Sequence, residues 1–191
     1  FCDYRIEASG KKINKYYGGT ALAQLPFFLV AHTTANFSEF DPDGYSKPYP
    51  LLITIAALFY LFIGLFFLDQ TLQLFEIGAF TRAIIPLAAV FGTNLFFYAV
   101  VEPGMSHVYS FAFIVMFVYF SKKYFATQNP RHALVLAALF GMILLIRPVN
   151  GLVLFALPFL AGSSSSFLAG MRYFFHKPVY ALLSAAICGF F

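Results

Sequence analysis

Residues 48–68 read PYPLLITIAALFYLFIGLFFL and contain no charged side chain. This stretch, between Lys47 and Asp69, is long enough to cross a bilayer core, which takes roughly 20 apolar residues in a helix. A helix is the expected form, because a lone strand leaves its backbone groups unsatisfied in lipid. The stretch therefore predicts a transmembrane helix.

The composition extends this prediction to the whole chain. Of the 191 residues, 61% are hydrophobic and 10% are charged, with a mean hydropathy of +0.79. Soluble domains carry about 25% charged residues. The 27 Phe and 12 Tyr form an apolar surface that a soluble chain of this size could not hide from water. The composition thus favours an integral membrane protein.

Further apolar windows predict more membrane segments, and all but one of them are free of charged residues. The longest, 133–161, is interrupted by Arg147 and is expected to break there, because a proline disfavours helical geometry at the residue before it. The sequence therefore predicts an all-α, polytopic transmembrane helix bundle with about six to seven membrane segments. The other windows are 16–38, 83–101, 103–121 and one that starts at 178.

The ends of the chain set the expected domain organisation. The chain begins at Phe1 and stops inside an apolar run, so we expect an internal piece of a longer protein. Residues 1–17 are expected to be the end of an outer loop. Residues 18–191 are expected to be a transmembrane helical domain that is incomplete at both ends.

The charged loops predict the orientation. The loops 121–132 and 162–177 are basic and are expected in the cytoplasm by the positive-inside rule. The serine tract 163–166 in the second loop is expected to be a flexible linker. If successive windows cross the membrane in alternating directions, the residues before Gly18 would also lie in the cytoplasm. This conflicts with the outer position expected for residues 1–17, so either one window is re-entrant or the positive-inside rule fails at this end.

Several classes of function find no support in the sequence. The net charge of +4 is scattered among loops, whereas a nucleic-acid-binding protein carries a basic patch or stripe. There is no P-loop, GxSxG elbow, HExxH motif or Cys/His metal cluster. Cys2 and Cys188 are expected to be unpaired thiols. A membrane enzyme without a nucleotide site would draw on a lipid-linked substrate.

A polar corner between two apolar windows is the first candidate site. It contains Glu102, Pro103, Ser106 and His107. Pro103 fits the first position of a helix, whose unpaired N–H groups and partial positive charge suit a phosphate. The alternative is that Glu102 is a solvated loop carboxylate and His107 an interfacial cap. The spacing leaves both interpretations open.

Arg147 is the second candidate, beside Asn150 at the expected helix break. An arginine at membrane depth costs about 2.5–3.5 kcal/mol on insertion scales, so it normally faces a cavity or a partner. Its guanidinium suits a bidentate phosphate contact. The alternative is an arginine at a helix end whose side chain reaches the headgroups.

Four other residues are candidates with simple structural alternatives. Lys15 and Tyr17 precede the first helix and are either substrate-binding residues or interfacial anchors. His32 is either a site residue or a satisfied core histidine. Asp43, before Gly44, is either a site residue or part of a plain turn.

The order of the short motifs resembles that of GT-C type integral membrane glycosyltransferases. The similarity is to bacterial, Bacteroidetes-like members related to the dolichyl-phosphate-mannose protein mannosyltransferase superfamily, and it spans nearly the whole chain. The motifs are Lys15-Tyr16-Tyr17-Gly18-Gly19-Thr20 with Pro26-Phe27-Phe28 and His32, Asp43-Gly44-Tyr45-Ser46, Thr93-Asn94 with Tyr98, Ser106-His107, and Arg147-Pro148-Val149-Asn150.

This resemblance implies sugar transfer from a polyprenyl-phosphate donor to an extracytoplasmic acceptor, by a multi-pass protein of the bacterial inner membrane. The general base would be a carboxylate upstream of Phe1, so the catalytic residue is unknown. Arg147, His107 and Lys15 would stabilise the leaving phosphate. Glu102 is a candidate ligand for a divalent metal ion, the one cofactor considered. The expected partners are the lipid bilayer and the lipid-linked sugar, with no nucleic acid.

Two other functions remain open. A transporter or flippase for an anionic or lipid-linked substrate would also use a broken helix and an intramembrane arginine. An internal inverted repeat would favour it, and we detect none. A non-catalytic scaffold for envelope assembly predicts instead that Arg147, His107 and Glu102 are dispensable.

Overall fold

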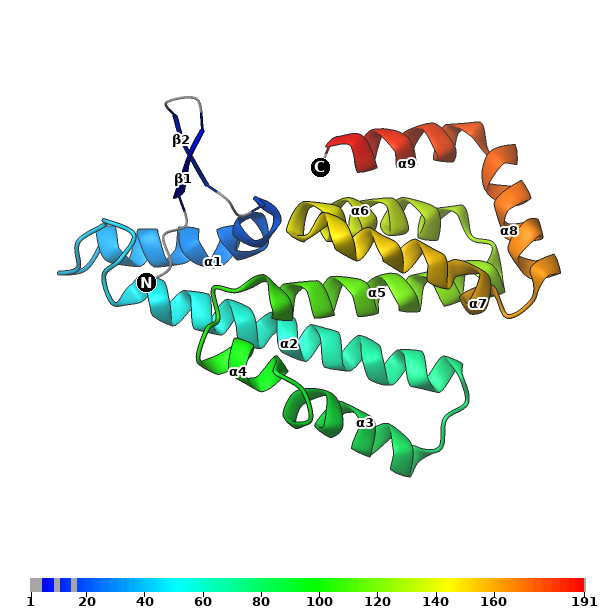
Figure 1. The fold of residues 1–191 in the computed structure, drawn as a ribbon, viewed down its shortest axis with the longest axis horizontal. Helices are drawn as coiled ribbons and strands as arrows, with labels where there is room; N and C mark the ends of the chain where they lie inside the picture. The colour runs from blue at the N-terminus through cyan, green and yellow to red at the C-terminus, as the bar shows by residue number, and fades with distance from the viewer. Residues whose placement is uncertain (1–4, 9–10, 15–16, 191) are drawn as a thin grey trace.

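The computed structural model describes residues 5–8, 11–14 and 17–190, and these form a helical structure with one small antiparallel hairpin (Figure 1). The expectation of a helical fold is confirmed, whereas the hairpin was not predicted. The elements are β1 Arg5–Ala8, β2 Lys11–Asn14, α1 Gly19–Asn36, α2 Pro48–Leu74, α3 Ala79–Phe91, α4 Leu95–Val100, α5 Ser106–Thr127, α6 Pro130–Ile146, the 3-10 helix η1 Pro148–Ala156, α7 Leu157–Ala161, α8 Ser164–His176 and α9 Pro178–Phe190.

Helices α2, α5 and α6 form the centre of the bundle; α2 and α5 run in the same direction, and α6 runs in the opposite direction (Figure 1). The C-terminal ends of α2 and α5 therefore meet at one end, where the Lys122 ammonium lies 4.7 Å from the centre of the Phe75 ring. We call this the basic end, defined by Arg82, Lys122, Lys123 and Arg131. The α6–η1 turn lies at the opposite end of α5.

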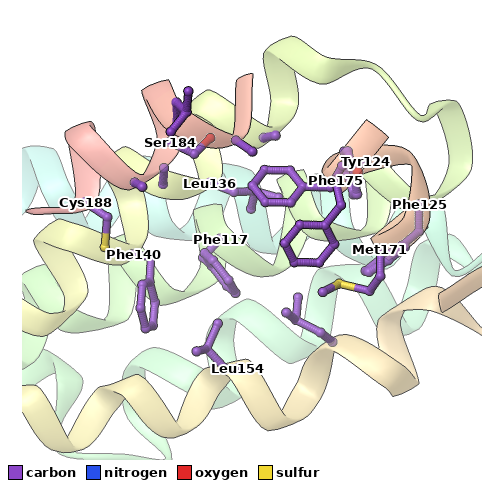
Figure 2. A pocket seen from close by; sticks show the side chains of 17 residues that line it. Phe117, Tyr124, Phe125, Leu136, Phe140, Leu154, Met171, Phe175, Ser184 and Cys188 are labelled. Carbon is purple, nitrogen blue, oxygen red and sulfur yellow. The ribbon is translucent and has the colours of Figure 1, made fainter. Parts of the chain in front are cut away.

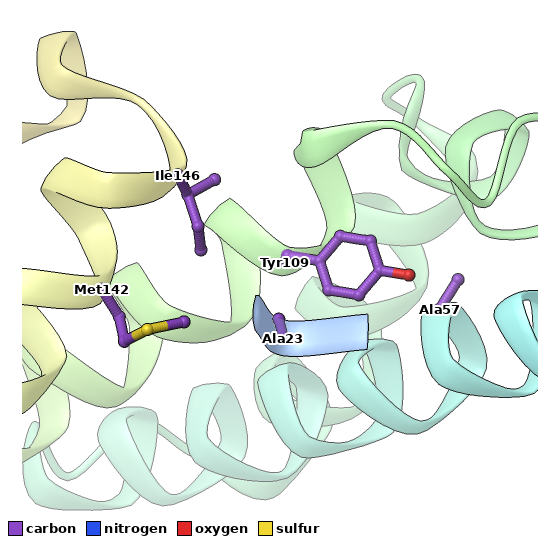
Figure 3. Packing of buried hydrophobic residues seen from close by; sticks show 5 residues of the cluster. All are labelled: Ala23, Ala57, Tyr109, Met142 and Ile146. Carbon is purple, nitrogen blue, oxygen red and sulfur yellow. The ribbon is translucent and has the colours of Figure 1, made fainter. Parts of the chain in front are cut away.

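Small residues bring α1, α2 and α5 close together. The buried cluster around Tyr109 joins α1, α2, α5 and α6, with Ala23 and Ala57 facing the tyrosine ring (Figure 3). At Gly19 a Cβ atom would overlap the backbone of Leu145 and Ile146, so only glycine allows α1 to start against the end of α6. The cluster fixes α1 on the side of the bundle where Arg147 lies.

The window 83–101 was predicted to be one helix, and this was wrong. Helix α3 ends at Phe91 and α4 begins at Leu95. The Thr93 hydroxyl donates to the Ala89 carbonyl at 2.6 Å and accepts from the Leu95 N–H at 3.2 Å. A glycine at 92 and a side chain that competes for backbone groups together interrupt the helix.

The predicted break at Arg147 is confirmed, but its position in the fold differs from the expectation. Arg147 is extended, with φ −154° and ψ 112°, as a residue before proline prefers. The chain then reverses: η1 runs back beside α6, and α7 packs against α5 (Figure 1). Arg147 is therefore at the tip of a helical hairpin at one end of the bundle, not in the middle of a membrane segment.

Three other boundaries differ from the sequence predictions. Helix α5 starts at Ser106, so Pro103 is not its first residue. Only residues 128–129 separate α5 from α6, in place of the longer basic loop. The serine tract is not a flexible linker, because the Ser163 side chain accepts a hydrogen bond from the Ser166 N–H and caps α8.

The number of helices that could span a membrane is smaller than expected. Among the described residues, α2 is long and apolar enough, and a second candidate is η1–α7 taken together with α8, which are bent by 118°. Helices α3 and α6 and the stretch 178–189 are apolar but shorter. By length and composition, one or two spans qualify, so the expectation of about six to seven is not met by this measure.

Candidate functional site

Arg147 makes two side-chain contacts with the first residues of α5. Its Nε donates to Ser106 Oγ at 2.7 Å, and its Nη2 lies 3.2 Å from His107 Nε2. A guanidinium only donates, so His107 Nε2 must be the acceptor in this contact. The imidazole is then neutral, with its proton on Nδ1.

Neighbouring contacts hold this pair of elements in place. The His107 ring stacks on Tyr98, with the ring centres 3.8 Å apart and the planes at 13°. One turn further along α5, Ser110 Oγ accepts a hydrogen bond from Asn150 Nδ2 at 3.0 Å. The α6–η1 turn is therefore fastened to α5 at two levels, which limits the freedom of the guanidinium.

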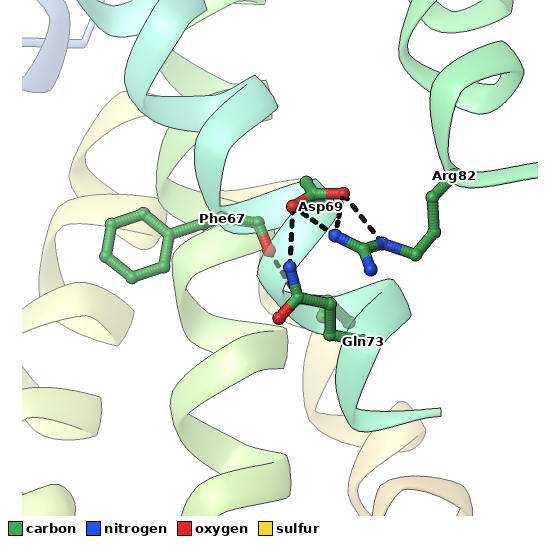
Figure 4. A network of polar contacts seen from close by, with 5 residues as sticks. Phe67, Asp69, Gln73 and Arg82 are labelled. Carbon is green, nitrogen blue, oxygen red and sulfur yellow. Dashed lines mark hydrogen bonds and ion pairs between the residues drawn. The ribbon is translucent and has the colours of Figure 1, made fainter. Parts of the chain in front are cut away.

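Arg147 has no carboxylate within ion-pair distance among the residues that the structure describes. Arg82 is the contrasting case. Its Nε and Nη2 donate to the two Asp69 carboxylate oxygens at 2.9 and 2.8 Å (Figure 4). The described partners of Arg147 are neutral, so no carboxylate of the described residues pairs with its positive charge.

A pocket of about 570 Å³ lies against Arg147, and we call it the Arg147 pocket. The starts of three helical elements, α1, α5 and η1, contribute to its wall. Within the described residues, neither Gly18 nor Met105, the N-cap residues of α1 and α5, makes a side-chain cap, so the partial positive charges of these two helix starts lie at the pocket wall. No lining residue is acidic; they include Tyr17, Thr20, Gln24, Ser106, Arg147 and Val149.

Most of the predicted site residues gather near this pocket. Arg147, Ser106 and Tyr17 line it, and His107 contacts Arg147 from the adjoining side. Asn150 packs against α5 one turn away. Arg147 and Ser106 are 41 residues apart in the sequence, and the sequence alone could not show that they lie close together in space.

Glu102 and Lys15 do not take part in the observed contacts. Glu102 is exposed, and its side chain makes no hydrogen bond or ion pair within the described part of the chain. Lys15 lies outside the described residues. Neither of the roles expected for them receives structural support.

His32 and Asp43 lie elsewhere in the fold. His32 Nδ1 is 2.7 Å from the Tyr49 hydroxyl, toward the far end of α1. The Asp43 carboxylate accepts hydrogen bonds from the N–H groups of Tyr45 and Ser46 at 2.8 and 2.9 Å. These two bonds lower the pKa of Asp43 below its usual value, because they stabilise the charged carboxylate. The structure supports the turn interpretation for Asp43.

Gln24 and Tyr109 were not predicted as site residues. Gln24 lines the pocket, and its Nε2 donates to the Tyr109 hydroxyl at 2.9 Å. Its signal in the sequence was an amide side chain inside the otherwise apolar run 21–31. Tyr109 gave no usable signal, because this chain has twelve tyrosines.

A metal site is not evident in the described residues, where no group of three or more His, Cys, Asp or Glu side chains could hold an ion. A second cavity, of about 510 Å³, lies between α5, α6, η1, α7, α8 and α9 (Figure 2). Its wall is almost wholly apolar and includes Phe117, Phe140, Met171 and Phe175. Such a wall suits a hydrocarbon chain and presents almost no polar group to a ligand.

The combination in the Arg147 pocket is an uncompensated guanidinium, a neutral histidine and uncapped helix starts. Groups of this kind have the chemistry that suits an anion such as phosphate. Comparison of the chain with protein-family models, curated proteins and solved structures finds no match.

Proposed function

We propose that this chain belongs to a polytopic membrane glycosyltransferase of the GT-C type, which moves a sugar from a polyprenyl-phosphate donor to an extracytoplasmic acceptor. The observation that carries the proposal is Arg147, whose described partners are all neutral and which lines a pocket at one end of an apolar helical bundle. The order of the sequence motifs supplies the choice of donor.

The exposed faces of the helices support a membrane location. In α2, only 22% of the most apolar window is buried, unlike the core helix of a soluble protein. Phe59, Phe62 and Phe66 are 48%, 67% and 59% exposed along one face of it. Lipid would cover this surface at no hydrophobic cost, whereas water would not. The shorter apolar helices would then lie in the bilayer against α2 as parts of the same bundle.

The dimensions and charges support an orientation. Helix α5 has 22 residues, so it is about 33 Å long, close to the thickness of a bilayer core of about 30 Å. Its C-terminal end lies at the basic end, which the positive-inside rule assigns to the cytoplasm. The Arg147 pocket would then open at the outer face, where an extracytoplasmic transfer takes place.

The proposed chemistry needs a stabilised leaving phosphate. As the sugar departs, charge builds on the phosphate oxygens, and fixed donors aimed at that position lower the barrier. Arg147 and the N–H groups at the start of α5 are such donors. Ser106 and His107 hold the guanidinium in place. No described residue is assigned as the general base.

A transporter or flippase for an anionic or lipid-linked substrate is the second candidate. The α3–α4 break and the 118° bend before α8 favour it, because discontinuous helices line substrate sites in transporters. Arg147 lies at the end of the bundle and not at its middle, which favours the transferase.

The test uses the full-length protein in proteoliposomes, a polyprenyl-phosphate donor with a labelled sugar, and an envelope extract as the source of acceptors. We expect cleavage of the sugar–phosphate bond, and a fall in rate on the order of 10²–10³-fold in Arg147→Gln. Arg82→Gln is the matched control and should keep its rate. Movement of intact donor across the bilayer without cleavage would overturn the proposal, as would full activity in Arg147→Gln.

A further inference from the structure

Gln24 brings an amide to the wall of a pocket whose other strong polar groups are donors. It is half-buried in the first turns of α1, on the side that faces α5. A neutral amide offers both a donor and an acceptor, so its orientation decides what it can bind. Its hydrogen bonds determine that orientation.

The contacts of Gln24 favour one orientation of the amide. The Tyr109 hydroxyl donates to the Pro103 carbonyl at 3.0 Å, so its oxygen is free to accept from Gln24 Nε2 at 2.9 Å. The same Nε2 lies 3.5 Å from the Pro103 carbonyl. A carbonyl only accepts, so a reversed amide would place two acceptors against each other. Nε2 therefore faces α5.

The anchor for this orientation is rigid. Tyr109 is fully buried in the cluster that joins α1, α2, α5 and α6 (Figure 3). Its ring cannot move without disturbing Ala23 and Ala57, against which it packs. The position of the amide is therefore set by the core of the bundle, before any ligand binds.

The Gln24 carbonyl oxygen takes no part in the hydrogen bonds between described residues. Oε1 has no hydrogen-bond partner among the described residues. It is also not one of the fully buried atoms that lack a partner, which in the described structure are Ser121 Oγ and Ser184 Oγ. Oε1 is thus an accessible acceptor on a side chain that lines the Arg147 pocket.

A hydrogen-bond acceptor in this pocket would not bind the phosphate itself. Phosphate oxygens accept from Arg147 and the helix N–H groups, and another carbonyl oxygen would repel them. A donor on the group attached to the phosphate would suit Oε1, and in a sugar phosphate that donor is a hydroxyl. We propose that Gln24 Oε1 accepts a hydrogen bond from a hydroxyl of the donor sugar and makes the site select a glycosylated lipid phosphate over a bare one. This inference rests on the proposed function.

The test compares two kinds of ligand on the full-length protein in nanodiscs: farnesyl phosphate, and its glucosyl, mannosyl and arabinosyl derivatives. At least one glycoside should bind more tightly than farnesyl phosphate. In Gln24→Met, which keeps the length of the side chain, this advantage should fall on the order of tenfold, while binding of bare farnesyl phosphate stays unchanged. For the wild type, a deoxy derivative that lacks the recognised hydroxyl should bind no more tightly than farnesyl phosphate. For Gln24→Met, removal of this hydroxyl should not weaken the binding of the glycoside any further.

Two further variants separate the possible failures. Tyr109→Phe removes the hydroxyl that orients the amide and should reduce the advantage without changing the affinity for bare farnesyl phosphate. Arg147→Gln should weaken binding of all the ligands, and if it does not, the proposed function itself is wrong. The inference about Gln24 is overturned if no glycoside binds better than farnesyl phosphate, or if Gln24→Met changes both affinities equally.

Discussion

Arg82 and Arg147 lie at opposite ends of the same bundle and are used in different ways. Arg82 shares both oxygens of Asp69, and its side chain is 26% exposed (Figure 4). Arg147 contacts a hydroxyl and a neutral imidazole, beside an open pocket. The first arrangement is complete without a ligand, whereas the second leaves a charge to be neutralised. The partners of the two arginines, more than their depth in the fold, are therefore the reason why we propose Arg147, and not Arg82, as a binding residue.

The largest effect should come from giving Arg147 a carboxylate partner within the protein. Ser106→Asp would place a carboxylate where Arg147 Nε now finds a hydroxyl, and would copy the Asp69–Arg82 pair. We expect the affinity for farnesyl phosphate to fall on the order of 10²-fold, because the new charge pairs with Arg147 and repels the phosphate. Ser106→Asn, of the same size but neutral, is the control and should bind nearly normally. Normal binding by Ser106→Asp would contradict the anion site.

The junction that builds the Arg147 end should be the next most sensitive. In Gly19→Ala the new methyl group would overlap the backbone of Leu145 and Ile146, which cannot move aside cheaply. We expect a loss of about 1–3 kcal/mol in the free energy of unfolding, measured by thermal or denaturant unfolding in detergent. The control is Gly18→Ala, where nothing lies within 4 Å of the added atom. Equal effects of the two substitutions would refute this packing.

A smaller effect is expected at the Asp69–Arg82 ion pair. The Asp69 side chain is 33% exposed, so solvent screens the interaction, and Asp69→Asn should cost at most about 1 kcal/mol of stability. Sugar transfer should not change. The exchange Asp69→Arg with Arg82→Asp should recover part of the lost stability. If Asp69→Asn abolished transfer, the assignment of roles to the two ends would be wrong.

The smallest effect concerns Asp43, which the structure places in a turn. Its pKa is lowered by the N–H groups of Tyr45 and Ser46, so the carboxylate supports the turn above its unfolded pKa. That support should be lost as the pH falls through the lowered folded pKa. Carboxyl-carbon NMR of the side chain should therefore show titration below 3.8, and Asp43→Ala should leave transfer unchanged. A raised pKa or an inactive variant would return Asp43 to the candidate site.

The sequence predicted some parts of this structure and not others, for physical reasons. Apolar windows located α1, α2, α5 and α6, and the proline after Arg147 located the break. The reversal of the chain at Arg147 could not be predicted, because a break does not give the direction in which the next helix runs. The serine tract was misjudged because serine suits both linkers and helix caps, and only the Ser163–Ser166 bond distinguishes them.

Part of the membership of the candidate site was predictable from the sequence, whereas its electrostatics were not. Arg147, Ser106 and His107 could be chosen from the sequence, because polar residues are rare within such apolar windows. The lack of a carboxylate beside Arg147 in the described structure depends on which helices meet, and local sequence does not contain that information. The same holds for Gln24, whose orientation depends on Tyr109, 85 residues away.

The most direct test asks from which side of the membrane the Arg147 pocket is reached. Val149, which lines the pocket and is 65% exposed, would be replaced by cysteine in the full-length protein with Cys2 and Cys188 changed to serine. Thr127→Cys marks the other end of α5. A membrane-impermeant maleimide should label position 149 in intact cells, with protection by farnesyl phosphate, and position 127 only after permeabilisation. Labelling of position 149 only after permeabilisation, or without protection by the lipid phosphate, would contradict an outward-facing phosphate site at Arg147.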